Sequence, residues 1–337
     1  MKQVGDYVRA VLGPQQLVVA DVGAAHGLPA HVEMLRDVAE LLLFEPNEQA
    51  ARELENQYSD LSTRLRVLRV ALSENGGART LYVTNAPTGS SLLAPRKEHA
   101  IEIGDSEYFF PVREVAIETR SLGSVLRETG VNRLDLIKLD VQGSEYEILR
   151  GLGSEHRETI LAVEVEIGLQ NAYADQPLFS DVDTLLRSWG LQLFDTKPAR
   201  SHRAKNGDYN YYPEKIFRVD SDSPTLSKRV WEFDAIYFRQ PDVFLANRDV
   251  AALRRLVSLQ SVYGFFPDAY CLVERAQVEG VLPSAEALGL LEAIRVWHQD
   301  LQSCVVYRPR MYKKLKRFGS ILRRLLCGRR TVRWLER

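Results

Sequence analysis

The chain has 337 residues, of which 45% are hydrophobic and 26% charged, and its 44 basic and 45 acidic side chains leave a net charge of −1. An ordinary apolar fraction with so little net charge excludes disorder for most of the chain. The length suggests about two structural units, since single domains usually hold roughly 100–200 residues. No uncharged apolar run approaches the roughly 20 residues of a membrane-spanning helix, and no signal peptide is expected.

The cysteines also bear on location. Cys271, Cys304 and Cys327 are far apart and lack Cys-x-x-Cys spacing, so they predict neither a disulfide framework nor a thiolate metal site. A cytoplasmic location is therefore expected.

The net charge combines two opposite parts. Residues 308–337 hold twelve Lys and Arg but one acid, a balance of +11, which leaves −12 on residues 1–307. The chain therefore joins an acidic body to a basic tail.

Residues 17–195 alternate between short apolar runs and amphipathic stretches, which is typical of βαβ units around a parallel sheet. Strands are predicted at Leu17–Val22, Leu41–Glu45, Leu65–Leu72, Leu134–Val141, Thr159–Ile167 and Leu191–Thr196. Helices are predicted at Ala30–Val38, Asn47–Tyr58, Leu122–Thr129, Glu145–Arg150 and Asp181–Trp189. A capping box of Ser144 and Glu147 is predicted to begin the fourth of these helices.

Two insertions interrupt this alternation. The first, about 85–113, is rich in turn residues and lies between strand-like pieces at Arg79–Thr84 and Arg113–Thr119. The second, 197–224, mixes basic residues with tyrosines. A last strand is predicted at Trp231–Arg239, and helical periodicity follows. We therefore predict one domain over residues 1–240 and a helical extension over residues 241–337.

The first predicted strand runs into a turn with the spacing Asp21-x-Gly23-x-Ala25-x-Gly27. Glycines permit a tight turn and close approach of the backbone to a ligand. Glu45 ends the next strand, where an acid can accept both hydroxyls of an adenosine ribose. Asp21 would repel the pyrophosphate of a nicotinamide cofactor but suits the amino group and sulfonium of S-adenosylmethionine. The pattern therefore favours S-adenosylmethionine.

Further segments extend this pattern along the chain. They are Asp21-Val-Gly-Ala-Ala-His-Gly, Phe44-Glu-Pro-Asn, Val70-Ala-Leu-Ser-Glu-Asn-Gly-Gly, Ser90-Ser-Leu, Glu118-Thr-Arg-Ser-Leu and Leu134-Asp-Leu-Ile-Lys-Leu-Asp-Val-Gln-Gly-Ser-Glu. Together they resemble the FkbM-type S-adenosylmethionine-dependent methyltransferases over roughly residues 15–240. The resemblance implies an α/β class I methyltransferase fold, a Rossmann-like doubly wound sheet of seven strands in the order 3-2-1-4-5-7-6. It also implies O-methylation of a hydroxyl, often on a sugar or another natural product.

The resemblance implies a set of cofactor-binding residues. They are Asp21, Gly23, Gly27, Glu45, Ala71, Asp140 and Gln142. Two positions depart from the common pattern, because Ala25 replaces the usual middle glycine and His26 lies where a small polar residue is common.

Catalysis is expected at the carboxyl ends of the central strands, where doubly wound sheets bind ligands. Methyl transfer requires alignment of the acceptor oxygen and removal of its proton, and Asp140, Glu166 and His26 are the candidates for this step. Asp140 and Glu166 also suit Mg²⁺, which prefers oxygen ligands. The alternatives are a turn carboxylate for Asp140, pairing of the acids Glu164 and Glu166 with Lys138 or an arginine, and a structural role for His26.

Acceptor contacts are predicted in both insertions, through Ser91 in the first and Arg203, Tyr209 and Tyr211 in the second. Aromatic faces suit sugar rings, and guanidinium groups suit carboxylate or phosphate. The expected partner is a sugar or glycoconjugate acceptor in surface-polysaccharide or natural-product biosynthesis. The alternatives are an ordinary turn at Ser91 and a solvated polar loop at 197–224.

The basic tail carries apolar residues at helical spacing. They are Met311, Leu315, Phe318, Leu322 and Leu325. A basic amphipathic helix favours contact with a membrane surface or with a partner such as a glycosyltransferase. Nucleic acid is not expected, because the body is acidic and no recognition motif is found. The tail could instead pack on the body. For the whole chain, the alternatives are a non-catalytic scaffold and an NAD-dependent sugar enzyme.

Overall fold

The computed structural model describes residues 4–61, 64–103, 109–202 and 229–304. The chain forms two compact units, residues 1–294 and 295–337, and the sheets belong to the first. The domain boundary at residue 240 stays a prediction. In the part of the chain that the structure describes, no helix is long and apolar enough to cross a membrane.

The main sheet has seven strands in the order β3-β2-β1-β7-β8-β10-β9. The strands are β1 (Leu17–Val22), β2 (Ala39–Phe44), β3 (Leu65–Leu68), β7 (Leu136–Leu139), β8 (Ala162–Gly168), β9 (Leu191–His202) and β10 (Arg229–Arg239). Neighbours are parallel except β10, which is antiparallel to both β8 and β9. Numbered among themselves, these strands give the order 3-2-1-4-5-7-6, so the predicted fold is confirmed.

The two faces of this sheet differ. On one face, alternate residues of β1, β7 and β8, such as Ala20, Ile137 and Val165, join a core with α5 (Leu122–Glu128), α6 (Glu145–Arg150) and α8 (Phe179–Ser188). Strand side chains alternate between faces. The residues between these core positions, including polar ones, therefore point to the opposite face.

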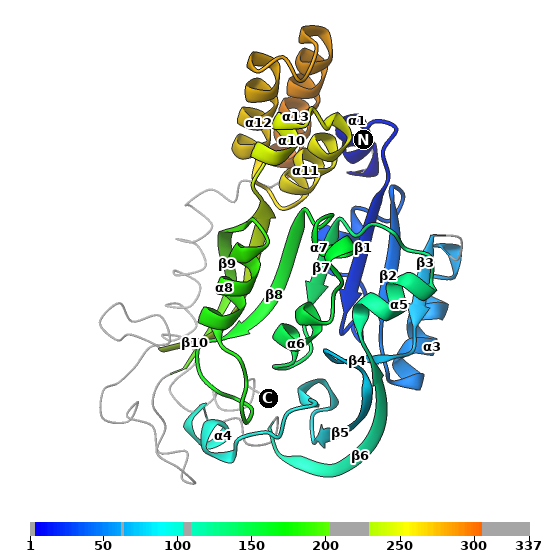
Figure 1. The fold of residues 1–337 in the computed structure, drawn as a ribbon, viewed down its shortest axis with the longest axis vertical. Helices are drawn as coiled ribbons and strands as arrows, with labels where there is room; N and C mark the ends of the chain where they lie inside the picture. Colours follow the sequence, from blue (N-terminus) through cyan, green and yellow to red (C-terminus); the bar gives the residue numbers. More distant parts are fainter. Residues whose placement is uncertain (1–3, 62–63, 104–108, 203–228, 305–337) are drawn as a thin grey trace, which may run out of the picture. The chain divides into compact units, whose positions relative to one another are not determined.

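The two strand-like pieces that flank the first insertion form, with a short strand before them, a second, three-stranded sheet in the order β4-β6-β5. Its strands are β4 (Ala71–Leu72), β5 (Gly77–Thr84) and β6 (Pro111–Arg120), and the short helix α4 (Lys97–Ile103) lies between β5 and β6 in sequence. Figure 1 shows this sheet and α4 beyond the carboxyl ends of the parallel strands. The predicted strand 65–72 is wrong as a single element, because β3 and β4 belong to different sheets.

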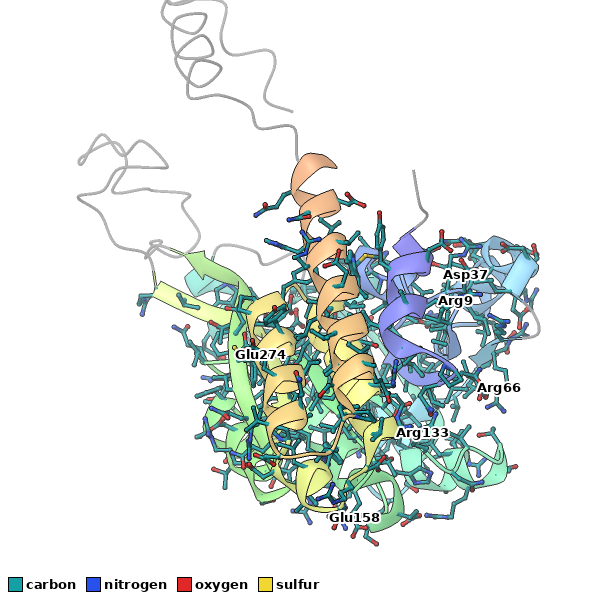
Figure 2. All side chains as sticks on the ribbon, turned by 90° about the horizontal axis from the view of Figure 1, so that it is seen from above. Arg9, Asp37, Arg66, Arg133, Glu158 and Glu274 are labelled. Atoms are coloured by element: carbon teal, nitrogen blue, oxygen red, sulfur yellow. The ribbon has the colours of Figure 1, made fainter. Side chains whose placement is uncertain are left out.

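The remaining helices lie before β1, between strands of the main sheet, or after β10. They are α1 (Val4–Leu12), α2 (Ala30–Glu33), α3 (Glu48–Gln57), α7 (Ser154–Arg157), α10 (Asp242–Ala246), α11 (Val250–Val262), α12 (Phe266–Val278) and α13 (Ser284–Cys304). The Arg9 guanidinium of α1 donates to the Asp37 carbonyl at 3.3 Å, which fixes α1 beside the chain that enters β2 (Figure 2). The helical periodicity after β10 is confirmed by α10 to α13.

The predicted capping box at α6 is wrong, although the helix begins where expected. The Ser144 hydroxyl is buried and makes no capping hydrogen bond, and Glu147 pairs with Arg79 instead. The Glu145 carboxylate stabilises this end of the helix instead. It accepts hydrogen bonds from the backbone N–H groups of Val141 and Gly143 at 3.0 and 3.1 Å.

Candidate active site

The glycine turn after β1 is closed against its neighbours. Gly23 has a φ of +89°, and its N–H donates to the Phe44 carbonyl at the end of β2 at 3.1 Å. A Cβ at Gly23 would lie 2.0 Å from the Asp140 carbonyl oxygen. Gly27 has a φ of +79°, and a Cβ there would lie 2.8 Å from the Tyr58 hydroxyl. A Cβ at Gly23 would therefore require movement of the backbone, one at Gly27 would displace the side chains of Tyr58 and Gln57, and the positive φ of both positions favours glycine.

Glu45 follows β2 and is 6% exposed. Its carboxylate accepts a hydrogen bond from the Asn47 N–H at 2.7 Å. Burial raises the pKa of Glu45, while this bond and the nearby imidazole of His26 act in the opposite direction. The structure therefore places His26 beside Glu45, at the end of the site where a ribose would lie.

Asp21 ends β1 and is almost wholly buried at 1% exposure. The nearest cation is the Lys138 ammonium, 3.5 Å from Oδ1, and neither carboxylate oxygen has a hydrogen-bond partner of normal length among the described residues. Burial raises the pKa of Asp21 to about 6, although Lys138 opposes this. Buried polar groups normally have hydrogen-bond partners, so Asp21 is ready to receive a donor from a ligand.

Asp21 belongs to a charged row that crosses the sheet. The register pairs Asp21 of β1 with Lys138 of β7, and Lys138 with Glu164 of β8. Glu164 Oε2 is 2.6 Å from His31 Nε2 and accepts a hydrogen bond from the Tyr263 hydroxyl at 2.7 Å. The row therefore links the cofactor end of β1 to Tyr263, which follows α11.

Hydrogen bonds and opposite charges keep Glu164 and Lys138 of this row ionised. Burial opposes the charge on Glu164, but hydrogen bonds from His31 and Tyr263 hold its pKa below the ordinary value. Burial likewise opposes the charge on Lys138, but the carboxylates of Asp21, Asp140 and Glu164 raise its pKa. Burial and the Glu164 carboxylate raise the pKa of Tyr263 well above its ordinary value. This hydroxyl therefore stays protonated and donates a hydrogen bond.

Gln142 connects the loop after β7 to three other segments. Its amide nitrogen donates to Asp140 Oδ1 at 3.1 Å and to Glu166 Oε2 at 2.8 Å, and its amide oxygen accepts from the Tyr173 hydroxyl at 3.0 Å. The Ser91 hydroxyl donates to its backbone carbonyl at 2.6 Å. Gln142 has a φ of +59°, which is unusual for a residue with a side chain, and these contacts hold it there.

These contacts bear on the metal hypothesis. The two carboxylates that suit Mg²⁺ in the sequence, those of Asp140 and Glu166, are bridged by the N–H donors of Gln142. A cation needs oxygen ligands, so this donor set does not fit a metal ion. Among the described residues, no group of three or more His, Cys, Asp or Glu side chains is arranged to hold a metal.

Of the remaining predicted site residues, two lie in the described part of the chain and three lie outside it. The Ser91 hydroxyl is buried and also accepts from the Leu93 N–H, so the structure uses it to join the first insertion to Gln142. Ala71 lies in β4 opposite Thr119 of β6. Arg203, Tyr209 and Tyr211 lie outside the described residues, as does the basic tail.

Sequence analysis missed three side chains near the site, which are His31, Tyr173 and Tyr263. The alternative pairs Glu164 and Glu166 with Lys138 or an arginine, whereas the structure pairs Glu164 with His31 and Tyr263 and bonds Glu166 to Gln142. The partners were not identified because they come from a one-turn helix, a loop and the C-terminal helices. Nothing in their local sequence indicates which strand residue they contact.

Comparisons with known proteins agree with this geometry. A family model described as the methyltransferase FkbM domain matches residues 21–193. Methyltransferase sdnD from Sordaria araneosa is 31% identical over 174 residues, which cover 45% of this chain and 67% of the relative. The 2-O-methyltransferase NoeI from Sinorhizobium fredii is 30% identical over 176 residues, which cover 50% of this chain and 70% of the relative.

A solved structure of a TehB-like methyltransferase from Corynebacterium glutamicum is 11% identical, with a TM-score of 0.29 over 71% of this chain and 89% of that chain. At this score the likeness carries no argument, and the fold assignment rests on the strand order.

Proposed function

The chain belongs to the FkbM family of methyltransferases, and we propose that it transfers a methyl group to a hydroxyl of a sugar or glycoconjugate. Family membership makes it an S-adenosylmethionine-dependent methyltransferase. The name of the relative NoeI, a 2-O-methyltransferase, supports oxygen as the acceptor atom. Such a reaction would serve the biosynthesis of a surface polysaccharide or a natural product.

The observation that carries this proposal is the arrangement at the ends of β1 and β2. Asp21 and Glu45 end neighbouring parallel strands, and Gly23 lies in close backbone contact with Asp140. The buried Asp21 carboxylate suits the amino group of S-adenosylmethionine, and Glu45 suits its ribose hydroxyls. The bound cofactor supplies the methyl group as a sulfonium.

Exposure distinguishes the acids near the reacting end. The Asp140 side chain is 38% exposed, whereas Asp21 and Glu166 are 1% and 7% exposed. An acceptor can therefore reach Asp140, and we propose that this carboxylate takes the proton of the attacking hydroxyl. Glu166 then acts through Gln142, which it holds in place, and His26 contributes at the ribose end beside Glu45.

Calorimetric titration with S-adenosylhomocysteine tests the cofactor site. The wild-type chain should bind, whereas Gly23→Asp and Glu45→Ala should lose binding. Unchanged titration of either variant would contradict the assignment.

Turnover measurements test whether the acceptor is a sugar hydroxyl and whether Asp140 is the general base. With a panel of free and linked sugars, the mass of a product should increase by one methyl group on oxygen. Asp140→Asn should retain S-adenosylhomocysteine affinity but lose roughly 10²–10⁴-fold in turnover, as expected when a general base is removed. The exposed Asp268 of α12 provides the matched control Asp268→Asn, which should change neither property. Methylation only on nitrogen or carbon would reject a hydroxyl acceptor.

A further inference from the structure

Lys138 of β7 lies between two acids of the candidate active site. Its Nζ is 3.5 Å from Asp21 Oδ1 and 3.8 Å from Asp140 Oδ2, and its side chain is 15% exposed. Both distances exceed the roughly 2.7–3.2 Å of a normal N–H···O hydrogen bond. The ammonium therefore attracts the Asp21 carboxylate without occupying its oxygens.

Strand pairing places Lys138 at this point. Its neighbours Ile137 and Leu139 belong to the hydrophobic core on one face of the sheet, so Lys138 points to the opposite face. The register sets Asp21 of β1 on one side of it and Glu164 of β8 on the other. Its position is therefore fixed by the central strands and not by a loop.

Asp21 lies among several titratable groups that come from different elements. They are Lys138, Asp140, Glu164, Tyr58 and Tyr263, with His31 beyond Glu164. Burial has the largest effect on the pKa of Asp21 and raises it, Lys138 lowers it, and the carboxylates of Glu164 and Asp140 raise it. Without Lys138, burial and both carboxylates would favour the protonated form of Asp21. A neutral carboxyl cannot form an ion pair with a cationic amino group.

Two other roles do not suit Lys138. Burial opposes its charge, but the neighbouring carboxylates raise its pKa, so the ammonium cannot take a proton from the acceptor hydroxyl at neutral pH. Glu164 does not depend on Lys138 for a partner, because His31 Nε2 lies 2.6 Å away and the Tyr263 hydroxyl donates to it at 2.7 Å. Asp21 is therefore the acid whose charge depends most on Lys138.

We propose that Lys138 is a positioning residue of the cofactor site, which keeps the Asp21 carboxylate ionised for the amino group of S-adenosylmethionine. The proposal rests on the proposed function and gives a role to a side chain that acts through Asp21 and not on the reacting atoms. An opposite charge at this distance usually lowers the pKa of a carboxyl by about 1–3. Removal of the ammonium should therefore move the acid-side loss of cofactor affinity to a higher pH.

Calorimetric titration of the full chain with S-adenosylhomocysteine between pH 5 and pH 8 tests this. Wild-type affinity should fall on the acid side with a midpoint near pH 6, where Asp21 gains a proton. In Lys138→Met the midpoint should lie at least about one pH unit higher. The ratio of variant to wild-type Kd should therefore be at least about five-fold larger at pH 6 than at pH 8. A merely structural loss would weaken binding by the same factor at every pH.

Controls separate the effect of charge from the effect of packing. Lys138→Arg keeps a cation and should keep the wild-type midpoint, whereas the second neutral variant, Lys138→Gln, should shift it. 5′-Methylthioadenosine keeps the adenosine but lacks the amino group, so its affinity should not show the pH-dependent loss. Arg255→Met removes a cation 3.0 Å from another buried acid, Asp135, which keeps Arg133 as a partner, and this variant should retain the wild-type midpoint.

An equal Kd ratio at pH 6 and pH 8 in Lys138→Met would overturn the proposal. Equal shifts in Lys138→Arg or Arg255→Met, or the same pH-dependent loss with 5′-methylthioadenosine, would also overturn it. If Lys138→Met does not fold, Lys138→Gln gives the same comparison. Failure of the wild-type chain to bind S-adenosylhomocysteine at any pH would instead reject the proposed function, so the two failures are distinguishable.

Discussion

Gly23 and Gly77 have similar backbone angles but different surroundings. Their φ values are +89° and +97°, yet a Cβ at Gly23 meets the Asp140 carbonyl, whereas a Cβ at Gly77 meets nothing within 4 Å. Both alanine variants should lose about 1–2 kcal/mol from backbone strain. Only Gly23→Ala should also weaken S-adenosylhomocysteine binding, by at least about ten-fold, because it displaces the loop that carries Asp140. Equal affinities by calorimetry would contradict this account of the turn.

The buried Asp21 carboxyl makes stability depend on pH. Burial raises its pKa to about 6, against about 3.9 in an unfolded chain, so between these values the native state holds a proton that the unfolded state lacks. Its contribution to stability is therefore present at acid pH and lost as the pH rises through 6. Relative to Asp21→Asn, the wild-type free energy of unfolding should fall by up to about 3 kcal/mol between about pH 4 and pH 7.

Urea unfolding of both proteins at several pH values measures this difference. Glu145, whose pKa burial raises to about 7, is present in both proteins and cancels from the comparison. Cofactor binding should show the opposite trend, because a cationic amino group binds the ionised carboxylate and loses affinity below about pH 6. A wild-type minus variant difference that is constant with pH would show that Asp21 does not titrate as described.

The motif singled out Asp21, Glu45 and Asp140 because each lies at the end of a strand or directly after one, at a fixed place in the topology. It could not show which acid is exposed, since exposure depends on what covers each side chain. Glu166 was a plausible base in the sequence, but its position beneath Gln142 depends on the unusual φ of that residue. No local pattern predicts that conformation.

Among the elements, β1 and α6 have the predicted bounds, whereas the helix predicted over Ala30–Val38 ends at Glu33. Its apolar residues Val32, Leu35 and Val38 are three apart. That spacing fits successive tight turns as well as an α-helix, and the bonds from Leu35 N–H to Val32 and from Val38 N–H to Leu35 are of the three-residue type. Periodicity alone could not separate these alternatives.

Two side chains could cap the start of α6, the Ser144 hydroxyl and the Glu145 carboxylate, and their removal should have different effects. The Ser144 hydroxyl has no hydrogen-bond partner among the described residues, so Ser144→Ala should change the free energy of unfolding by no more than about 0.5 kcal/mol. Glu145→Ala removes the acceptor of the Val141 and Gly143 N–H groups and should cost about 1–3 kcal/mol, because buried donors lose their partner. Denaturant unfolding measures the free energy of unfolding of both variants. If Ser144→Ala lost more stability than Glu145→Ala, the capping box of Ser144 and Glu147 would be supported after all.

At the scale of the whole molecule, Tyr263 joins the helices after β10 to the charged row of the sheet. Tyr263→Phe removes the hydrogen bond to the Glu164 carboxylate and should cost about 1.5–3 kcal/mol of stability. Glu164 then restrains Lys138 less, and S-adenosylhomocysteine affinity should fall by about two- to five-fold. Tyr270→Phe on α12 is the control, because no described residue forms a hydrogen bond with its hydroxyl. Equal effects in both variants would contradict a link through Glu164.

The charge division of the chain makes a prediction about association. Residues 1–307 carry a net charge of −12 and residues 308–337 a net charge of +11. An anionic surface should therefore attract the tail and repel the body. Each basic residue near an anionic membrane contributes about 1 kcal/mol, and added salt weakens this attraction. The full chain should sediment with phosphatidylserine vesicles at low salt and much less with phosphatidylcholine vesicles. Deletion of residues 308–337 should abolish sedimentation while S-adenosylhomocysteine affinity stays unchanged. If the truncated chain sediments equally well, or if truncation weakens cofactor binding, the tail acts as part of the folded body rather than as a membrane contact.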